Sequence, residues 1–73
     1  MRRLNYKHLQ YFYTVAELSG IQAAADRLSV TPQTISGQLK LLEDELGEPL
    51  FRKQGRGIQL TDAGHLALEY CRD

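Results

Sequence analysis

The sequence predicts one mainly α-helical domain that also carries a small two-stranded hairpin. Two observations predict this class. Apolar residues recur at helical spacing along most of the chain, and two short apolar runs flank a basic, glycine-containing segment near residue 55. A length of 73 residues, with 42% hydrophobic and 25% charged residues, suits a single small domain with one modest core.

The first helix is expected over residues 5–18. Its apolar side chains fall at helical spacing: Leu9, Phe12, Tyr13 and Ala16. Asn5 is the expected N-cap, with Leu4 and Leu9 at the hydrophobic positions that flank such a cap. Four aromatic residues are interpreted as core, the alternative being a platform that stacks single-stranded bases: Tyr6, Tyr11, Phe12 and Tyr13.

A second, short helix is expected over residues 21–28, after a break at Ser19-Gly20. Its inner face is small and apolar: Ala24, Ala25 and Leu28. A third helix begins at Thr31-Pro32, a capping hydroxyl followed by proline at the first helical position. It carries an apolar stripe and ends at Gly47: Ile35, Leu39, Leu42 and Leu46.

The hairpin is expected to pair Leu50-Phe51 with residues 58–60 around a basic turn at residues 52–57. Thr61 then caps a last helix with one apolar face: Leu66, Ala67 and Tyr70. This helix reaches Asp73 without a stop signal, so we expect it to continue further.

This order of elements predicts a winged helix-turn-helix, with the helix-turn-helix at about residues 20–39 and the wing at about residues 50–60. In that fold the second helix of the pair presents its N-terminal residues to base edges in the major groove of DNA. Polar residues that suit this role lie there: Thr31, Pro32, Gln33, Thr34, Ser36, Gly37, Gln38 and Lys40. The alternative is a solvated polar face.

A second set of candidate DNA contacts lies outside that helix. The wing carries cations suited to phosphates or to a narrow minor groove: Arg52, Lys53 and Arg56. Gln22, near the start of the short second helix, is a further candidate. At the N-terminus, contacts to the DNA backbone are also open: Arg2, Arg3 and Lys7. A solvated charged hairpin is the alternative for the wing.

Other classes of function find little support. Cys71 is the single cysteine and is interpreted as a partly buried small residue, and His8 and His65 lack metal ligands at useful spacing. The acidic residues at the end of the third helix are interpreted as a solvated face: Glu43, Asp44, Glu45 and Glu48. We therefore expect no enzyme, no cofactor in this domain, no membrane span and no signal peptide, and a cytoplasmic location.

Over residues 5–68 the chain resembles the LysR-type transcriptional regulators. The resemblance rests on spaced motifs: His8-Leu9-x-x-Phe12-x-x-Val15-Ala16-Glu17, Ala24-Ala25-x-x-Leu28, Ser36-x-Gln38-Leu39-x-x-Leu42-Glu43-x-x-Leu46-Gly47, Leu50-Phe51 and Leu60-Thr61-x-Ala63-Gly64. The chain departs from the family by reading Thr31-Pro32-Gln33 where Ser-Gln-Pro is usual, and Gly37 where arginine is common. Because of these departures, the base preference of other family members cannot be assigned to this chain.

The resemblance implies a DNA-binding domain at residues 1–61 and, at residues 62–73, the start of a linker helix that pairs two subunits. It implies double-stranded DNA as partner, a homodimer (possibly a tetramer at full length) and a further C-terminal domain that binds a small-molecule or ion effector. Within the family the chain is similar to activators that control a sodium/proton antiporter gene. The alternative is a winged-helix protein-interaction module without DNA binding.

The formal net charge of zero hides a segregation of charge along the chain. Residues 1–40 carry five basic and two acidic side chains, and residues 49–60 carry three basic and none acidic. Residues 41–48 carry four acidic and no basic side chains, and residues 61–73 carry three acidic and one basic. Both positive segments contain proposed DNA-facing elements, so the balance predicts weak non-specific attraction rather than excluding DNA.

Overall fold

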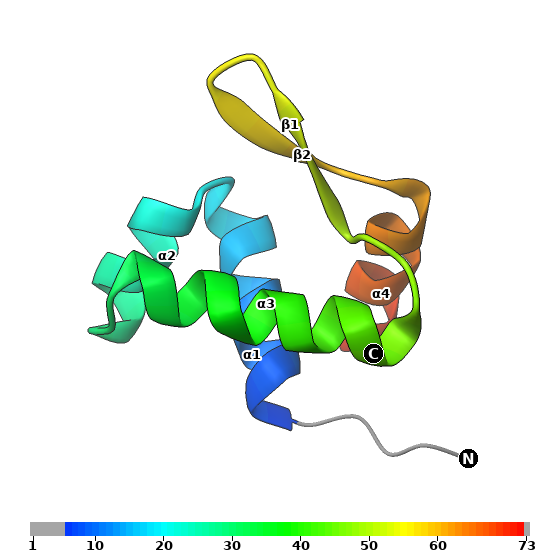
Figure 1. Cartoon of the computed structure of the whole chain (residues 1–73), viewed down its shortest axis with the longest axis horizontal. Helices are drawn as coiled ribbons and strands as arrows, with labels where there is room; N and C mark the ends of the chain where they lie inside the picture. The colour runs from blue at the N-terminus through cyan, green and yellow to red at the C-terminus, as the bar shows by residue number, and fades with distance from the viewer. Residues whose placement is uncertain (1–5, 73) are drawn as a thin grey trace.

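The computed structural model describes residues 6–72 and contains four helices and one two-stranded sheet in this part of the chain (Figure 1). The order is α1 (Tyr6–Leu18), α2 (Ile21–Leu28), α3 (Pro32–Leu46), β1 (Phe51–Gln54), β2 (Gly57–Leu60) and α4 (Asp62–Arg72). This is the expected winged helix-turn-helix. The expected cap at Asn5, its neighbour Leu4 and the basic pair Arg2-Arg3 lie outside the described residues.

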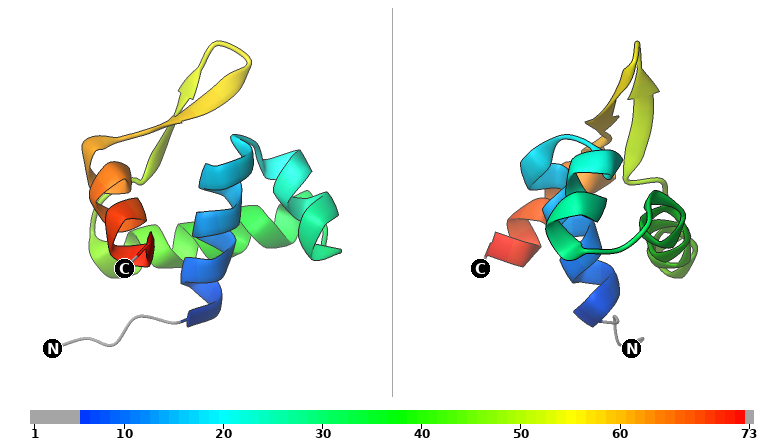
Figure 2. Two further views of the ribbon diagram at one scale, coloured as in Figure 1. Left: turned by 180° about the vertical axis from the view of Figure 1, so that it is seen from behind. Right: turned by 90° about the vertical axis from the view of Figure 1, so that its left-hand side faces the viewer.

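The core forms where α1, α2 and α3 meet. Its fully or almost fully buried side chains are Phe12, Val15, Ala24, Ala25, Ile35, Leu39, Leu42 and Leu50. The small side chains of Ala24 and Ala25 allow α2 to approach its neighbours closely. In the left view of Figure 2, α2 lies against one end of α3 while α1 crosses in front of the middle of α3. The core thereby fixes α3 by one face and leaves the opposite face uncovered.

Two expectations about the core were wrong. Tyr6 is 88% exposed and Tyr13 is 36% exposed, because α1 turns the side that carries Phe12 and Val15 inward and leaves both tyrosines outside it. Leu46 is 39% exposed, since it lies on the last turn of α3, where the chain already leaves the helix at Gly47.

The helix starts and stops expected from the sequence are confirmed at both ends of α3. Thr31 is the N-cap and Pro32 the first helical residue, and Gly47 ends the helix with φ of 79°. Its N–H donates to the Glu43 carbonyl oxygen at 2.8 Å. A left-handed residue at this position closes the last turn and redirects the chain. The chain therefore turns away from α3 directly into the wing.

The strands of the wing are longer on the basic side than expected. β1 and β2 pair antiparallel from Phe51↔Leu60 to Gln54↔Gly57, so Arg52 and Lys53 belong to β1 and the turn itself is Gly55-Arg56. Backbone pairing continues into the polar residues because ladder hydrogen bonds do not depend on an apolar side chain. The ring centroids of Phe51 and Phe12 lie 5.4 Å apart, so the base of the wing packs against the core.

Helix α4 packs on the bundle through a face that overlaps only in part with the one expected from the sequence. Ala63, Ala67, Leu68 and Cys71 lie against the core. Leu66 is 70% exposed and Tyr70 is 66% exposed. The expected apolar face was therefore wrong at these two positions, because α4 turns the side that carries Ala63, Ala67 and Cys71 toward the core. The end of α4 is joined to α1 by an ion pair between Arg72 and Glu17 at 3.2 Å.

Candidate nucleic-acid interface

The N-terminal half of α3 presents a polar surface on the side away from the core. Gln33, Thr34, Ser36 and Gly37 are exposed, whereas Ile35 and Leu39 are buried on the opposite side. Helical periodicity explains this division, since residues three and four apart share a face. The described chain forms no hydrogen bond to the side chain of Gln33 or Ser36. Their donors and acceptors therefore remain open to a partner.

The first turn of α3 is organised by its own hydroxyl groups. Thr31 Oγ1 accepts from the backbone N–H of Thr34 at 3.1 Å and lies 3.0 Å from Thr34 Oγ1. Pro32 has no N–H, so among the first helical residues the backbone N–H of Gln33 is left for an external acceptor. The helix N-terminus thus offers fewer free N–H groups than its position alone suggests, and Gln33 carries both the free backbone donor and an amide side chain.

Three further candidates on the helices are placed less favourably. Gln38 is only half-exposed. Lys40 forms an exposed ion pair with Asp44 at 3.4 Å, and Gln22 on α2 donates to Asp26 Oδ1 at 3.2 Å. Such exposed contacts are weak and can be exchanged for a phosphate. For Lys40 and Gln22, binding to DNA would require giving up or rearranging the contact that the free domain makes.

The candidate cations of the wing are exposed, and the described chain provides no ion pair for any of them. Arg56 lies in the turn at the tip. Arg52 and Lys53 are neighbours on β1, so their side chains leave opposite faces of the hairpin. The wing therefore does not bring all three cations to one surface. A two-stranded hairpin is narrow, however, so both of its faces can lie near the backbone of a DNA duplex.

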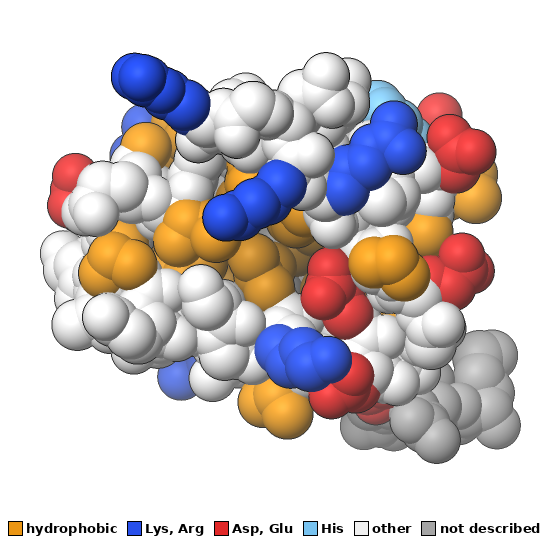
Figure 3. Space-filling model, turned by 45° about the horizontal axis from the view of Figure 1, so that its top comes forward, with side chains coloured by type: hydrophobic (Ala, Val, Ile, Leu, Met, Phe, Trp, Pro, Cys, Tyr) orange, Lys and Arg blue, Asp and Glu red, His pale blue; other side chains and the backbone are white. Residues whose placement is uncertain are grey.

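The charges on this face of the molecule are separated in space as well as in sequence. In Figure 3, Lys and Arg side chains lie along the wing and over α3, while most Asp and Glu side chains gather on the right, where α3 ends and α4 lies. A polyanion is therefore attracted toward the wing and repelled from the end of α3.

One residue interpreted as solvated has a structural role. Glu43 is half-buried, and its Oε2 accepts from the backbone N–H groups of Leu50 at 2.8 Å and Phe51 at 3.4 Å. The interpretation of Glu43 as a solvated residue was therefore wrong. No local sequence signal predicts this role of Glu43, because its partners lie seven and eight residues later in the chain, beyond the end of the helix and a turn.

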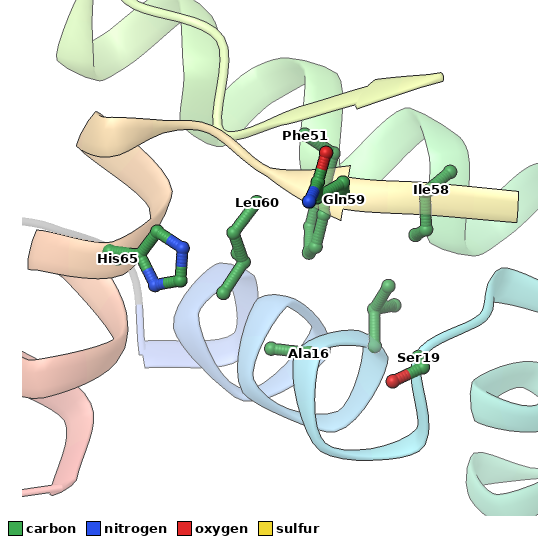
Figure 4. A pocket seen from close by; sticks show the side chains of 8 residues that line it. Ala16, Ser19, Phe51, Ile58, Gln59, Leu60 and His65 are labelled. Atoms are coloured by element: carbon green, nitrogen blue, oxygen red, sulfur yellow. The ribbon is translucent and has the colours of Figure 1, made fainter. Parts of the chain in front are cut away.

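A hollow of about 230 Å³ lies between the wing and the end of α1 (Figure 4). It is lined mainly by apolar side chains: Val15, Ala16, Ser19, Phe51, Ile58, Gln59, Leu60 and His65. Ser19 and His65 lie at its opposite ends, so the two do not form a nucleophile–base pair (Figure 4). Within the described residues, no group of three or more metal-ligating side chains occurs and no helix is long and apolar enough to cross a membrane.

Comparison with known proteins places these features in a family. Residues 6–65 match the model of the bacterial regulatory helix-turn-helix proteins of the lysR family. The transcriptional activator protein NhaR of Escherichia coli is 41% identical over 71 residues, which are 97% of this chain and 24% of that protein. The regulator TrpI of Pseudomonas aeruginosa is 46% identical over 65 residues, which are 89% of this chain and 22% of that protein.

Solved structures agree with this assignment. The CbnR DNA-binding domain in complex with DNA is 43% identical, with a TM-score of 0.88 over 94% of this chain and 79% of that one. The BenM DNA-binding domain in complex with catB site 1 DNA is 33% identical, with a TM-score of 0.89 over 94% of this chain and 78% of that one. The chain thus spans nearly a quarter of the length of the curated relatives.

Proposed function

The chain belongs to the lysR family and is the DNA-binding domain of a transcriptional regulator, and from this premise we propose that it reads a specific sequence in double-stranded DNA. The N-terminal half of α3 enters the major groove and the wing contacts the flanking backbone. The observation that supports this most directly is the exposed polar face of α3, whose Gln33 and Ser36 have no partner in the described chain.

The proposed roles follow from the chemistry of each side chain. Gln33 can bind an adenine by two hydrogen bonds, and Ser36 can donate to or accept from several base edges. Gly37 has nothing within 4 Å of the position that a β-carbon would take, so the groove can approach the backbone there. Arg56 and Lys53 bind phosphates, which strengthens binding without selecting a sequence.

Pairing of two copies through α4 is the second part of the proposal. Leu66 and Tyr70, one helical turn apart, are 70% and 66% exposed, so α4 offers an apolar strip that the fold itself does not cover. A homodimer would place two copies of α3 on half-sites one or two turns of the duplex apart. Sedimentation of the chain in solution tests this pairing by measuring whether its mass is that of one copy or two. Leu66→Asp is the variant that should disrupt the dimer.

The finer assignment that we propose is an activator of the NhaR type that controls a sodium/proton antiporter gene and carries a C-terminal effector domain at full length. The match to NhaR over 97% of this chain supports this assignment. Transcription of such a gene with and without the full-length regulator tests it, and unchanged transcription would remove the finer assignment while leaving DNA binding intact.

A salt titration tests DNA binding against the alternative of a protein-interaction module. Counterion release makes log K fall with log[salt] by about 0.9 per phosphate neutralised. The anisotropy of a labelled duplex, selected from a random-sequence pool with the chain itself, should therefore show affinity falling steeply as salt rises. Binding that is absent at low salt, or insensitive to salt, would favour the interaction module.

A further inference from the structure

Among the described residues, one side chain of α3 forms hydrogen bonds to the start of the wing. Glu43 Oε2 receives the N–H groups of both Leu50 and Phe51, at 2.8 and 3.4 Å. Leu50 is only 1% exposed, so its N–H has little access to water and needs an acceptor within the protein. A half-buried carboxylate that accepts from backbone N–H groups makes charge-assisted hydrogen bonds, which are stronger than neutral ones.

The same stretch of backbone is held from its other side by the start of α4. Thr61 Oγ1 donates to the Pro49 carbonyl oxygen at 2.7 Å, and the Thr61 N–H donates to the Leu50 carbonyl oxygen at 3.0 Å. Among the described residues, the hydrogen bonds between α3 and the base of the wing are those of Glu43. Thr61 thus fixes the wing to α4, and Glu43 fixes it to α3.

Resting on the DNA-binding function proposed above, we propose that Glu43 is a positioning residue for the wing. Its carboxylate holds the base of the hairpin at a set orientation to α3. A wing held in this way delivers Arg56 to the DNA backbone while α3 lies in the groove. Glu43 itself touches no DNA in this scheme, and its effect on affinity passes through the cation at the tip of the wing.

The sign of the expected effect separates positioning from simple electrostatics. Removing a negative charge from a protein that binds a polyanion strengthens binding if charge alone matters. Loss of a positioning contact weakens binding instead. Both hydrogen bonds converge on one oxygen of Glu43, so a glutamine at this position keeps an acceptor there and loses only the charge.

The experiment compares Glu43→Gln and Glu43→Met with Glu45→Met as matched control. Methionine keeps the chain length and helix propensity but provides no comparable acceptor. Glu45 lies on the same turn of α3 and does not bond to Leu50 or Phe51, so its variant removes an equal charge without touching the wing. The probe is a duplex selected from a random-sequence pool with the unmodified chain, measured by anisotropy over a range of salt.

We expect Glu43→Met to weaken binding about tenfold and to flatten the salt dependence by about 0.9 in slope, the share of one phosphate. Glu43→Gln should stay within about twofold of the unmodified chain, because hydrogen bonding to an amide oxygen is retained. Glu45→Met should bind as well or more tightly. A simple loss of stability would lower the fraction of active protein without changing the slope of log K against log[salt].

A double-variant comparison assigns the effect to the wing. Arg56→Ala should lower the affinity for the duplex about tenfold in the unmodified chain and less than about twofold in Glu43→Met. In Glu43→Met the misplaced wing has already lost this contact. Gln33→Ala should cost the same in both backgrounds, because α3 keeps its place. Equal losses for Arg56→Ala in the two backgrounds would overturn the role of Glu43 while leaving DNA binding itself standing.

Folding is checked on the same samples by circular dichroism and by amide hydrogen exchange. In Glu43→Met we expect faster exchange at Leu50 and Phe51 and unchanged exchange in the middle of α3. Should Glu43→Met not fold, Glu43→Asp replaces it, since its carboxylate falls one methylene short of the two N–H groups. Failure of the unmodified chain to bind any duplex would overturn the proposed function, and that result is distinct from an effect of Glu43.

Discussion

Gly64, on the first turn of α4, packs directly against the backbone of Leu50. A β-carbon on Gly64 would overlap the carbonyl oxygen of Leu50 and lie 2.8 Å from Leu60 Cδ2. The Leu50 oxygen also accepts a hydrogen bond from the N–H of Thr61, so it cannot move aside freely. This close approach lets α4 lie against both the wing and α1.

Gly64→Ala is therefore expected to lower the free energy of unfolding by about 3 kcal/mol, because the new methyl group meets backbone rather than a flexible side chain. Urea denaturation followed by circular dichroism measures the change. Gly37→Ala is the control within a helix, since nothing lies within 4 Å of its added β-carbon. There alanine should raise stability by about 0.5–1 kcal/mol. Equal effects at the two glycines would contradict the packing argument.

Thr31→Ala should lower the free energy of unfolding by about 1 kcal/mol, because the Thr34 N–H loses its capping acceptor. Thr31→Asp restores a cap of comparable strength and adds negative charge at the start of α3, which lies next to DNA in the proposed complex. We expect Thr31→Asp to recover stability in thermal unfolding and to bind DNA more weakly than Thr31→Ala. Tighter binding by Thr31→Asp would place this end of α3 away from the duplex.

Gln33→Ala should reduce affinity for a selected duplex by roughly 1–3 kcal/mol, the value of one good bidentate base contact. Affinity for a random duplex of equal length should change little, since a neutral side chain adds little to phosphate binding. Competition between the two duplexes measures the ratio directly. A loss of equal size on both duplexes would contradict a base-reading role for Gln33.

Arg56→Ala and Lys53→Ala should weaken selected and random duplexes alike. Each variant should flatten the slope of log K against log[salt] by about 0.9, the contribution of one phosphate contact. Arg72→Ala provides the control, because this arginine pairs with Glu17 at the far end of α4 and leaves the wing unchanged. An unaltered slope in both wing variants would show that the hairpin does not reach the DNA backbone.

Burial raises the pKa of the Cys71 thiol above its ordinary value, so less thiolate is present in the folded chain than in an unfolded one at the same pH. Alkylation by iodoacetamide between about pH 7 and about pH 10, which spans the ordinary thiol pKa of roughly 8.5, should be slower in the folded chain. The contribution of the thiol to stability is full below its ordinary pKa and is lost as pH rises through the folded value. Equal alkylation rates in folded and urea-unfolded protein would contradict this burial.

Helix boundaries were predicted well where a local signal specifies them. Thr31 with Pro32 begins α3 and Gly47 ends it, because the cap, the proline ring and the left-handed residue all act within a few residues of the chain. The limits of β1 were not predicted, since nothing in the side chains of Arg52 and Lys53 separates a strand from a turn. Their strand conformation depends on backbone pairing with β2.

The candidate DNA-contacting residues were also chosen from local chemistry, and the fold exposes most of them on α3 and the wing. The sequence could not reveal which of these side chains already form hydrogen bonds or ion pairs within the protein. Thr31 caps its own helix, Lys40 pairs with Asp44, and Gln22 bonds to Asp26. These contacts depend on rotamers and neighbours, so the sequence pattern treats all of these residues as equally available.

The sequence by itself determined the order of the elements, the caps of α3 and the segregation of positive from negative segments, because each follows from short-range propensity or from counting charges. Only the tertiary structure decided that Glu43 supports the wing, that Gly64 must lack a side chain and that Leu66 and Tyr70 remain exposed on α4. These outcomes arise where α3, the wing and α4 are brought together. Contacts between segments so far apart in the chain are set by packing rather than by local preference.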